Sequence, residues 1–284
     1  MYSVSRLYSP QMLTAPLADL DAWVAHFSDA EIPVLRRTAR WLDAYREDTE
    51  TLNARGVAGM IAGDPLMTLR VLAHISTHKA RGQLTDIESV EGAMLMMGLP
   101  KFFKTFSNLA LVEERLKGHS AAHLGLMRVI ARAHRASAFA HAWAVHRRDL
   151  DIREILLATQ LHDMAEMLLY CFAPELALKL ADLQRRNPKL RSRVAQKEVL
   201  GIVLQDLESK LMRRWMLPEL LVQMIDHAHA DHPRVRNVIC AVNLARHSAN
   251  SWEDPALPDD YDDIAQLLSL SPERVAESVR QMEV

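Results

Sequence analysis

Apolar residues recur at spacings of three and four along almost the whole chain, and this pattern limits the possible folds most. The 284 residues include only 9 glycines, and alternation of apolar and polar residues over the length of a strand is hard to find. Such spacing places the apolar side chains on one face of an α-helix. The sequence therefore predicts an all-α fold, a multi-helical bundle.

Two long helices are expected in the centre of the chain. Ala121 to Val145 is predicted as one helix, and Arg153 to Phe172, which Pro174 follows, as a second. Lys79 to Thr85, which contains Gly82, is predicted as a loop. Further helices are expected after Pro33, at 53–62, from Asp64 and Pro65, at 89–97, 100–116, 174–186 and 197–215, from Pro218, from Pro233 and from Ser271.

The best internal boundary lies at Lys117, Gly118 and His119, just before the first long central helix. We therefore expect an N-terminal helical lobe at 16–117 packed on a helical core at 118–250, together one domain over 16–250. Residues 251–284 are expected to form a linker and a C-terminal helix, because Ser251 to Asp263 is polar and rich in proline.

Charge and hydropathy exclude several classes of protein. Lys and Arg number 34 against 36 acids, a net charge of −2, which argues against nucleic acid or an anionic membrane held by overall charge. No stretch approaches the roughly 18 to 20 apolar residues of a membrane span, and no secretory signal is visible near the N-terminus. A P-loop and a dinucleotide-binding glycine motif are also missing from the sequence. We expect a soluble, cytoplasmic protein without a membrane partner.

The 13 histidines suggest metal or proton chemistry only where they gather with carboxylates. His162 and Asp163 lie in the middle of a predicted apolar helix, and a charge buried there must be compensated. His134 is 28 residues upstream on the preceding predicted helix, which can return antiparallel to it. His227 and His229 lie in a short downstream segment that is rich in His and Asp.

Two interpretations of His162 and Asp163 stay open from spacing alone. They form either a buried hydrogen-bonded pair that fixes helix packing, or part of a mixed nitrogen and oxygen site for Mg, Mn, Fe or Zn. The metal alternative needs ligands from other helices.

The order of these motifs resembles the HD superfamily of metal-dependent phosphohydrolases, and specifically its non-catalytic offshoot, the HD-related output domain (HDOD). The resemblance covers roughly Pro16 to Asn250. It implies an HD-like helical core and a role in bacterial signal transduction. The matching segments are IPVL at 32–35, MIAGDPLMTLRVL at 60–72, VEGAMLMMGL at 90–99, LHDMAEML at 161–168 and RWMLPE at 214–219, followed by His227 and His229.

Departures from the catalytic pattern bear on the chemistry that the resemblance implies. Catalytic members follow the His-Asp motif with Gly-Lys, whereas this chain has Ala165 and Glu166, so an anion replaces a cation that would meet phosphate. The final metal-ligand aspartate of the superfamily falls near Asn243, and a neutral amide holds a divalent ion more weakly. A GYP tripeptide, the mark of cyclic di-GMP phosphodiesterases, is missing. The resemblance thus implies a vestigial or weak metal site of His134, His162, Asp163 and Asn243, with Glu166, His227 and His229 near a possible ligand pocket.

Three functional hypotheses follow. The first is a non-catalytic output or adaptor protein that binds a signalling partner or a small ligand, without a cofactor. The second is a divergent metal-dependent phosphohydrolase acting on a nucleotide or cyclic dinucleotide. The third is a helical interaction protein, a possible homo-oligomer, in which only a surface matters. A basic run from Arg185 to Lys197 is either solvated charge that flanks the helices, which is the commoner case, or a surface for an acidic partner or nucleic acid, of which nucleic acid is the less expected.

Overall fold

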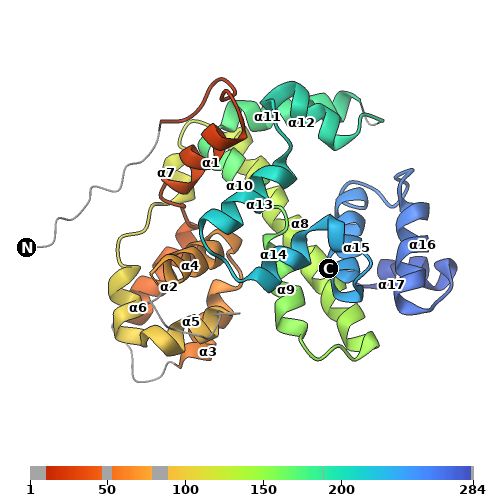
Figure 1. Ribbon diagram of the computed structural model, residues 1–284, viewed down its shortest axis with the longest axis horizontal. Coiled ribbons are helices and arrows are strands. Elements are labelled where there is room, and N and C mark those ends of the chain that lie inside the picture. Colours follow the sequence, from red (N-terminus) through yellow and green to blue (C-terminus); the bar gives the residue numbers. More distant parts are fainter. Residues whose placement is uncertain (1–10, 47–52, 79–88, 188, 283–284) are drawn as a thin grey trace, which may run out of the picture. The chain divides into compact units, whose positions relative to one another are not determined.

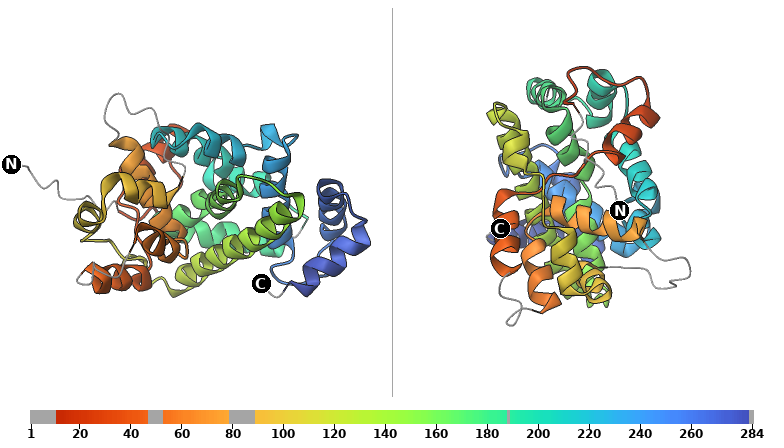
Figure 2. Two further views of the ribbon diagram at one scale, coloured as in Figure 1. Left: turned by 90° about the horizontal axis from the view of Figure 1, so that it is seen from below. Right: turned by 90° about the vertical axis from the view of Figure 1, so that its left-hand side faces the viewer.

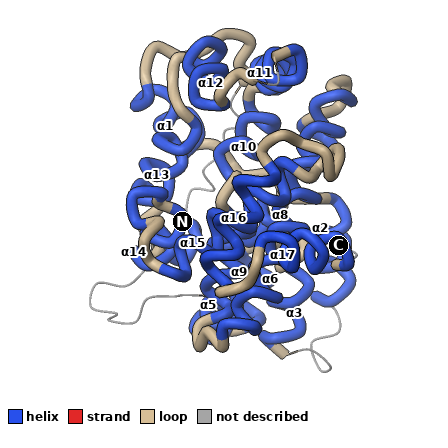
Figure 3. The backbone as a smooth tube through the Cα atoms, turned by 90° about the vertical axis from the view of Figure 1, so that its right-hand side faces the viewer, coloured by secondary structure: helices blue, strands red, loops and turns tan. Residues whose placement is uncertain are grey.

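The computed structural model of the protein describes residues 11–46, 53–78, 89–187 and 189–282. Within these ranges the chain is helical and forms no strand; Val34 and Leu111 make only an isolated parallel bridge. Figure 3 shows helices joined by loops throughout the described chain. The predicted all-α fold is confirmed. The predicted loop at Lys79 to Thr85 lies outside the described residues.

The helices group into two compact units, and the chain passes between the units more than once. The first unit comprises Met1–Arg128 and Met164–Leu217, and the second comprises Val129–Asp163 and Pro218–Val284. Segments far apart in the sequence therefore share a unit; Figure 1 colours the chain by position in the sequence, so that these segments can be located. The expected domain bounds at 16 and 250, and the division at Lys117, stay predictions.

The first unit contains most of the helices. Its members are α1 (Leu20–Ser28), α2 (Arg36–Arg46), α3 (Ala54–Ile61), α4 (Pro65–Thr77), α5 (Val90–Met97), α6 (Leu99–Thr105), α7 (Val112–Arg115), the first part of α8 (Ser120–Arg147), α10 (Met164–Phe172), α11 (Pro174–Arg186), α12 (Ser192–Leu200) and α13 (Leu204–Arg214).

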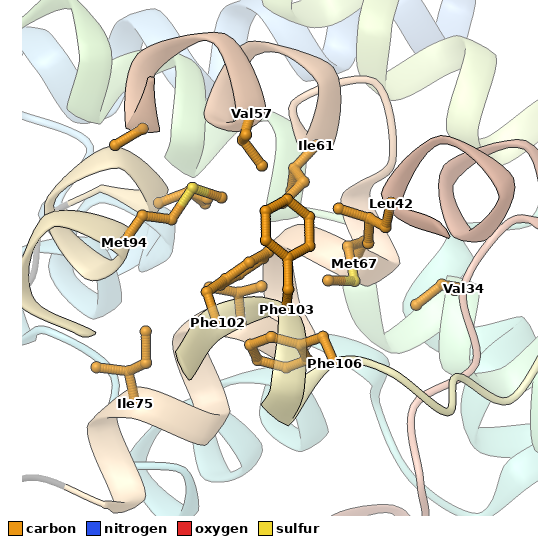
Figure 4. Close-up of a cluster of buried hydrophobic side chains, with 13 residues drawn as sticks. Val34, Leu42, Val57, Ile61, Met67, Ile75, Met94, Phe102, Phe103 and Phe106 are labelled. Carbon is orange, nitrogen blue, oxygen red and sulfur yellow. The ribbon is translucent and has the colours of Figure 1, made fainter. Parts of the chain in front are cut away.

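One core of this unit forms where α3, α4, α5 and α6 converge (Figure 4). The rings of Phe102 and Phe106 lie 4.8 Å apart between their centroids, and Ile61, Met67 and Met94 are fully buried in the same cluster. Burial of large apolar side chains of this kind is the main stabilising term in folding.

Asp64 joins two helices of the same unit. Its Oδ1 accepts the backbone N–H groups of Leu66 and Met67 at 3.1 and 3.2 Å and so caps α4. Its Oδ2 accepts the N–H of Leu35, just before α2, at 2.8 Å. The side chain is fully buried, and burial raises the pKa of this carboxyl group although the hydrogen bonds oppose the effect.

The second unit is arranged around α15 (Pro233–His247), which contacts α9 (Ile152–Leu161), α14 (Glu219–Ile225) and α16 (Leu257–Leu268). The other members are the last part of α8, the 3₁₀ helix η1 (His227–His229) and α17 (Pro272–Gln281), which pairs with α16 (Figure 2). Asn237 of α15 is fully buried and donates from Nδ2 to the carbonyl oxygen of Ala140 on α8 at 3.2 Å. Both α8 and α9 are thus held against α15.

The predicted single helix from Arg153 to Phe172 is wrong. α9 ends at Leu161, α10 begins at Met164, and His162 and Asp163 form a turn between them. Adjacent side chains do not face each other in a helix, whereas here Nδ1 of His162 lies 3.1 Å from Oδ1 of Asp163. The break therefore lets the two side chains pair.

Three other sequence predictions also fail locally. The helix expected at 100–116 ends at Thr105, because the chain then pairs with Val34: the N–H of Val112 donates to the carbonyl oxygen of Val34 at 2.9 Å. The helix expected at 197–215 is split by Gly201, which ends α12 in the left-handed conformation. The stretch expected as a linker contains most of the first two turns of α16.

Candidate functional site

The turn between α9 and α10 places His162 and Asp163 inside the second unit. Each residue is 8% exposed. A carboxylate at this depth needs hydrogen bonds and opposite charge to offset the loss of water. The partners of Asp163 therefore determine what the site can do.

Two arginines supply those partners. Oδ2 of Asp163 accepts hydrogen bonds from Nε and Nη2 of Arg132 on α8, at 3.1 and 2.6 Å. Oδ1 accepts a hydrogen bond from Nη2 of Arg246 on α15 at 3.0 Å. Because a charged hydrogen bond is stronger than a neutral one, the three elements are joined at this carboxylate.

The charge state of Asp163 follows from these contacts. Burial by itself raises its pKa, but Arg132, Arg246 and the hydrogen bond from His162 outweigh burial and hold the pKa of Asp163 well below its usual range. The carboxylate is therefore ionised at neutral pH and shared between two guanidinium groups.

His162 extends this cluster toward the surface. Its Nδ1 faces Oδ1 of Asp163, and its Nε2 lies 3.1 Å from Nε2 of His227 in η1. If both rings are neutral, Nδ1–H of His162 donates to the carboxylate and its Nε2 accepts the Nε2–H of His227. The result is a chain of hydrogen bonds from the buried carboxylate of Asp163 to the partly exposed imidazole of His227.

The surroundings of His227 disfavour its protonation. Partial burial, followed by the nearby His162 and Arg246, lowers the pKa of His227 from 6.5 to about 4. His229 contacts a different residue: its Nδ1 lies 3.4 Å from Oδ2 of Asp226, and its side chain is 54% exposed. Of the two downstream histidines, His227 is the one joined to His162.

Comparison with known proteins identifies the family. Residues 32–231 match the HDOD domain family. The chain belongs to the HDOD family. The match includes Arg132, His162, Asp163 and His227 of the cluster, whereas Arg246 lies beyond it.

Two solved structures with the same fold have TM-scores above 0.6. The MmoQ response regulator from Methylococcus capsulatus is 18% identical, covers 88% of this HDOD chain and 98% of its own, and has a TM-score of 0.61. A virulence factor from Campylobacter jejuni is 16% identical, covers 92% of both chains and has a TM-score of 0.63. At this identity the likeness shows the HDOD fold. No curated protein matches the chain.

The remaining predicted site residues lie on three helices. His134 is half-buried on α8, two residues after Arg132, and residues two apart on a helix point in different directions. Asn243 is half-buried on α15, one turn before Arg246. Glu166 is half-buried on α10 in the first unit, and its role in a ligand pocket stays a prediction.

Sequence reasoning missed Arg132 and Arg246. The requirement that a buried Asp163 be compensated was visible, but the chain has 34 Lys and Arg side chains and nothing in their spacing singles out two of them. The available signal was position: Arg132 lies on the same predicted helix as His134, and Arg246 follows Asn243 by one turn.

As arranged, the side chains around Asp163 do not fit a divalent metal ion. Over the described residues, no group of three or more His, Cys, Asp or Glu side chains is arranged to hold a metal, whereas protein zinc sites use three or four such ligands. Both oxygens of Asp163 are already bonded to guanidinium groups. Weak metal binding by His134, His162, Asp163 and Asn243 stays a prediction.

The described helices include none that is both long and apolar enough to cross a membrane.

Proposed function

We propose that this HDOD protein is a signal-transduction output or adaptor protein that acts by binding a partner protein or a small ligand, and that its HD-type site does not cleave phosphoesters. One observation carries the proposal. Arg132 and Arg246 donate to both oxygens of Asp163, the atoms that a catalytic metal would need.

The electrostatics around the turn support the same conclusion. Metal-assisted hydrolysis needs an ion that is open to water and to a phosphoryl oxygen. Here the positive charges beside Asp163 are guanidinium groups, which are always protonated and cannot activate water. The cluster can fix helices and present His227 to a ligand, but it offers no general route to an activated nucleophile.

The fold similarity to a protein described as a response regulator supports a signalling context. The proposed location is the cytoplasm, and the proposed partner is a signalling protein or a small ligand.

A combined metal and hydrolysis experiment tests the proposal. The purified full chain is incubated with MnCl₂, MgCl₂ or ZnCl₂, its melting temperature is recorded, and hydrolysis of cyclic di-GMP and nucleoside triphosphates is measured. His162→Ala and Asp163→Asn serve as matched controls. We expect that the metals do not raise the melting temperature of the wild-type chain more than that of either variant. We also expect that the wild-type chain hydrolyses these nucleotides no faster than His162→Ala does.

Hydrolysis that disappears in His162→Ala would establish the alternative, a divergent metal-dependent phosphohydrolase. In that case one or more metals should also raise the melting temperature of the wild-type chain, because a ligand that binds only the folded state stabilises it.

A further inference from the structure

The turn between α11 and α12 and the helix ends beside it carry a dense group of exposed cations. We call the described residues of this segment of the first unit, 185–187 and 189–197, the basic hairpin. Arg185 and Arg186 end α11, with side chains 76% and 71% exposed. The whole set, all exposed, is Arg185, Arg186, Lys189, Arg191, Arg193 and Lys197.

Ordinary helix rules explain only part of this charge. Arg185 and Arg186 lie at the C-terminal end of α11, where the helix dipole favours cations, and both pair with Asp182 at 2.5 and 2.8 Å. Arg191 and Arg193 lie at the N-terminal end of α12, where the dipole opposes them. α12 has neither a side-chain cap nor an acid in its first turn. Such a departure from local preference points to an interaction.

An exposed apolar side chain accompanies the cations. Val194, in the first turn of α12, is 50% exposed, while Ala195 and Val199 of the same helix are buried. A surface with an apolar contact among charges suits a protein partner better than a nucleic-acid backbone, which takes charge alone.

The second unit carries a surface of opposite charge. Asp259, Asp262 and Asp263 are exposed on α16, and their spacing of three and four residues places them on one side of the helix. Asp263 also pairs with Arg236 of α15, whose Nη2 lies 3.2 Å from Oδ1, so the docking charge comes mainly from Asp259 and Asp262. We call these three residues the acidic face. Residues 251–273 contain no Lys, Arg or His. The opposite side of α16 is buried through Leu257, Tyr261 and Ile264.

We propose that the basic hairpin of one copy of this chain docks on the acidic face of a second copy. Each chain carries both surfaces, so two copies of the chain supply both sides of the contact. Charge complementarity of this kind fixes the orientation and speeds association. The proposal does not depend on the chemistry at Asp163.

Sedimentation velocity on the full chain tests the dimer. We expect a dimer at about 50 mM NaCl and weaker association at about 500 mM, because salt screens exposed charges. Two reversals are made: Arg191→Glu with Arg193→Glu in the basic hairpin, and Asp259→Lys with Asp262→Lys in the acidic face. Each reversal alone should weaken self-association at least about tenfold.

Mixing the two reversed proteins supplies the decisive comparison, since their surfaces are again complementary and the mixture should form a dimer. The matched control is Arg40→Glu with Lys104→Glu, two exposed cations elsewhere on the first unit, which makes the same change in net charge and should leave the dimer intact. Circular dichroism confirms that each variant is folded.

Three outcomes would overturn the proposal. One is a wild-type chain that is monomeric at low salt; another is a dimer that neither reversal weakens. The third is a monomer that binds double-stranded DNA with a salt dependence lost in the Arg191→Glu, Arg193→Glu protein, which would assign the basic hairpin to nucleic acid instead.

Discussion

Arg246 reaches Asp163 across 83 residues of sequence, and its Nη2 donates to Oδ1 at 3.0 Å. Arg132, on a different helix, donates to the other oxygen of Asp163, Oδ2. A carboxylate held in this way joins α8, α15 and the turn after α9. The His-Asp motif, His162 and Asp163, is therefore part of an ion cluster inside the second unit.

Replacing Asp163 should destabilise the protein strongly. Asp163→Asn keeps the size of the side chain but leaves two guanidinium groups facing a neutral amide. Loss of one partner of a buried ion pair costs about 3–5 kcal/mol. Urea denaturation followed by circular dichroism measures the change in the free energy of unfolding.

The control for this variant is Asp182→Asn, which removes a half-exposed surface carboxylate that also pairs with two exposed arginines. Exposed ion pairs contribute about 0–1 kcal/mol. Equal losses for the two variants would contradict the assignment of Asp163 to a buried ion cluster.

The contribution of Asp163 should depend on acid pH. Its folded-state pKa lies well below the usual range, since Arg132 and Arg246 outweigh burial, whereas the unfolded value is about 3.9. The stabilisation is complete above about pH 5 and is lost as the pH falls through the folded pKa. The difference in unfolding free energy between wild type and Asp163→Asn should be constant from pH 7 to about pH 5 and shrink below about pH 4.

The stabilisation by Asp64 should depend on pH in the opposite direction to that by Asp163. Burial raises its folded-state pKa, so the folded state holds the proton more tightly than the unfolded state. Its contribution is greatest below its usual pKa and decreases as the pH rises through the folded value. The gap between wild type and Asp64→Asn should therefore narrow on going from about pH 4 to pH 7, and a gap that widens would refute this sign.

His227 should make the protein less stable as the solution becomes mildly acidic. Partial burial, His162 and Arg246 lower its pKa from 6.5 to about 4. Between these values the unfolded chain binds the proton and the folded chain does not, so stability falls with falling pH. His227→Gln should lose less stability than wild type between pH 7 and about pH 4.5. A titration of the imidazole by NMR that returned an ordinary pKa for His227 would contradict the prediction.

Gly125 should not tolerate a methyl group. A Cβ at this position of α8 would lie 2.4 Å from Cε1 of Tyr170 on α10, both in the first unit. Gly125→Ala should destabilise the protein by about 1–3 kcal/mol, the usual cost of overpacking. Gly59→Ala on α3, where nothing lies within 4 Å of the added Cβ, should instead be stabilising by about 0.5–1 kcal/mol. Thermal or urea unfolding of both variants makes the comparison.

Helices were predictable wherever apolar periodicity and capping residues agreed. Ser89 caps α5, and Gly98 ends it with a positive φ, as the residue types favour. The predicted linker was wrong at 257–263, because proline and acids masked a helical spacing through Leu257, Tyr261 and Ile264. The predicted helix failed at 106–111 because a contact with Val34, distant in sequence, outweighed the local pattern.

The candidate site was predictable only in part. His162, Asp163 and His227 were identified, and the structure joins them. The pairing of Arg132 and Arg246 with Asp163 was not predictable, because it depends on which faces of α8 and α15 turn toward the break after α9.

The sequence alone determined that the fold is helical, because its apolar residues recur at helical spacing. It also indicated the HDOD family, because the His-Asp motif and the segments around it occur in the order typical of that family. Both follow from the residue types and their positions in the chain. Only the tertiary structure decided that guanidinium groups surround Asp163. A buried carboxylate needs a cation beside it, but helix packing decides which cation that is. The cation can come from any position along the chain.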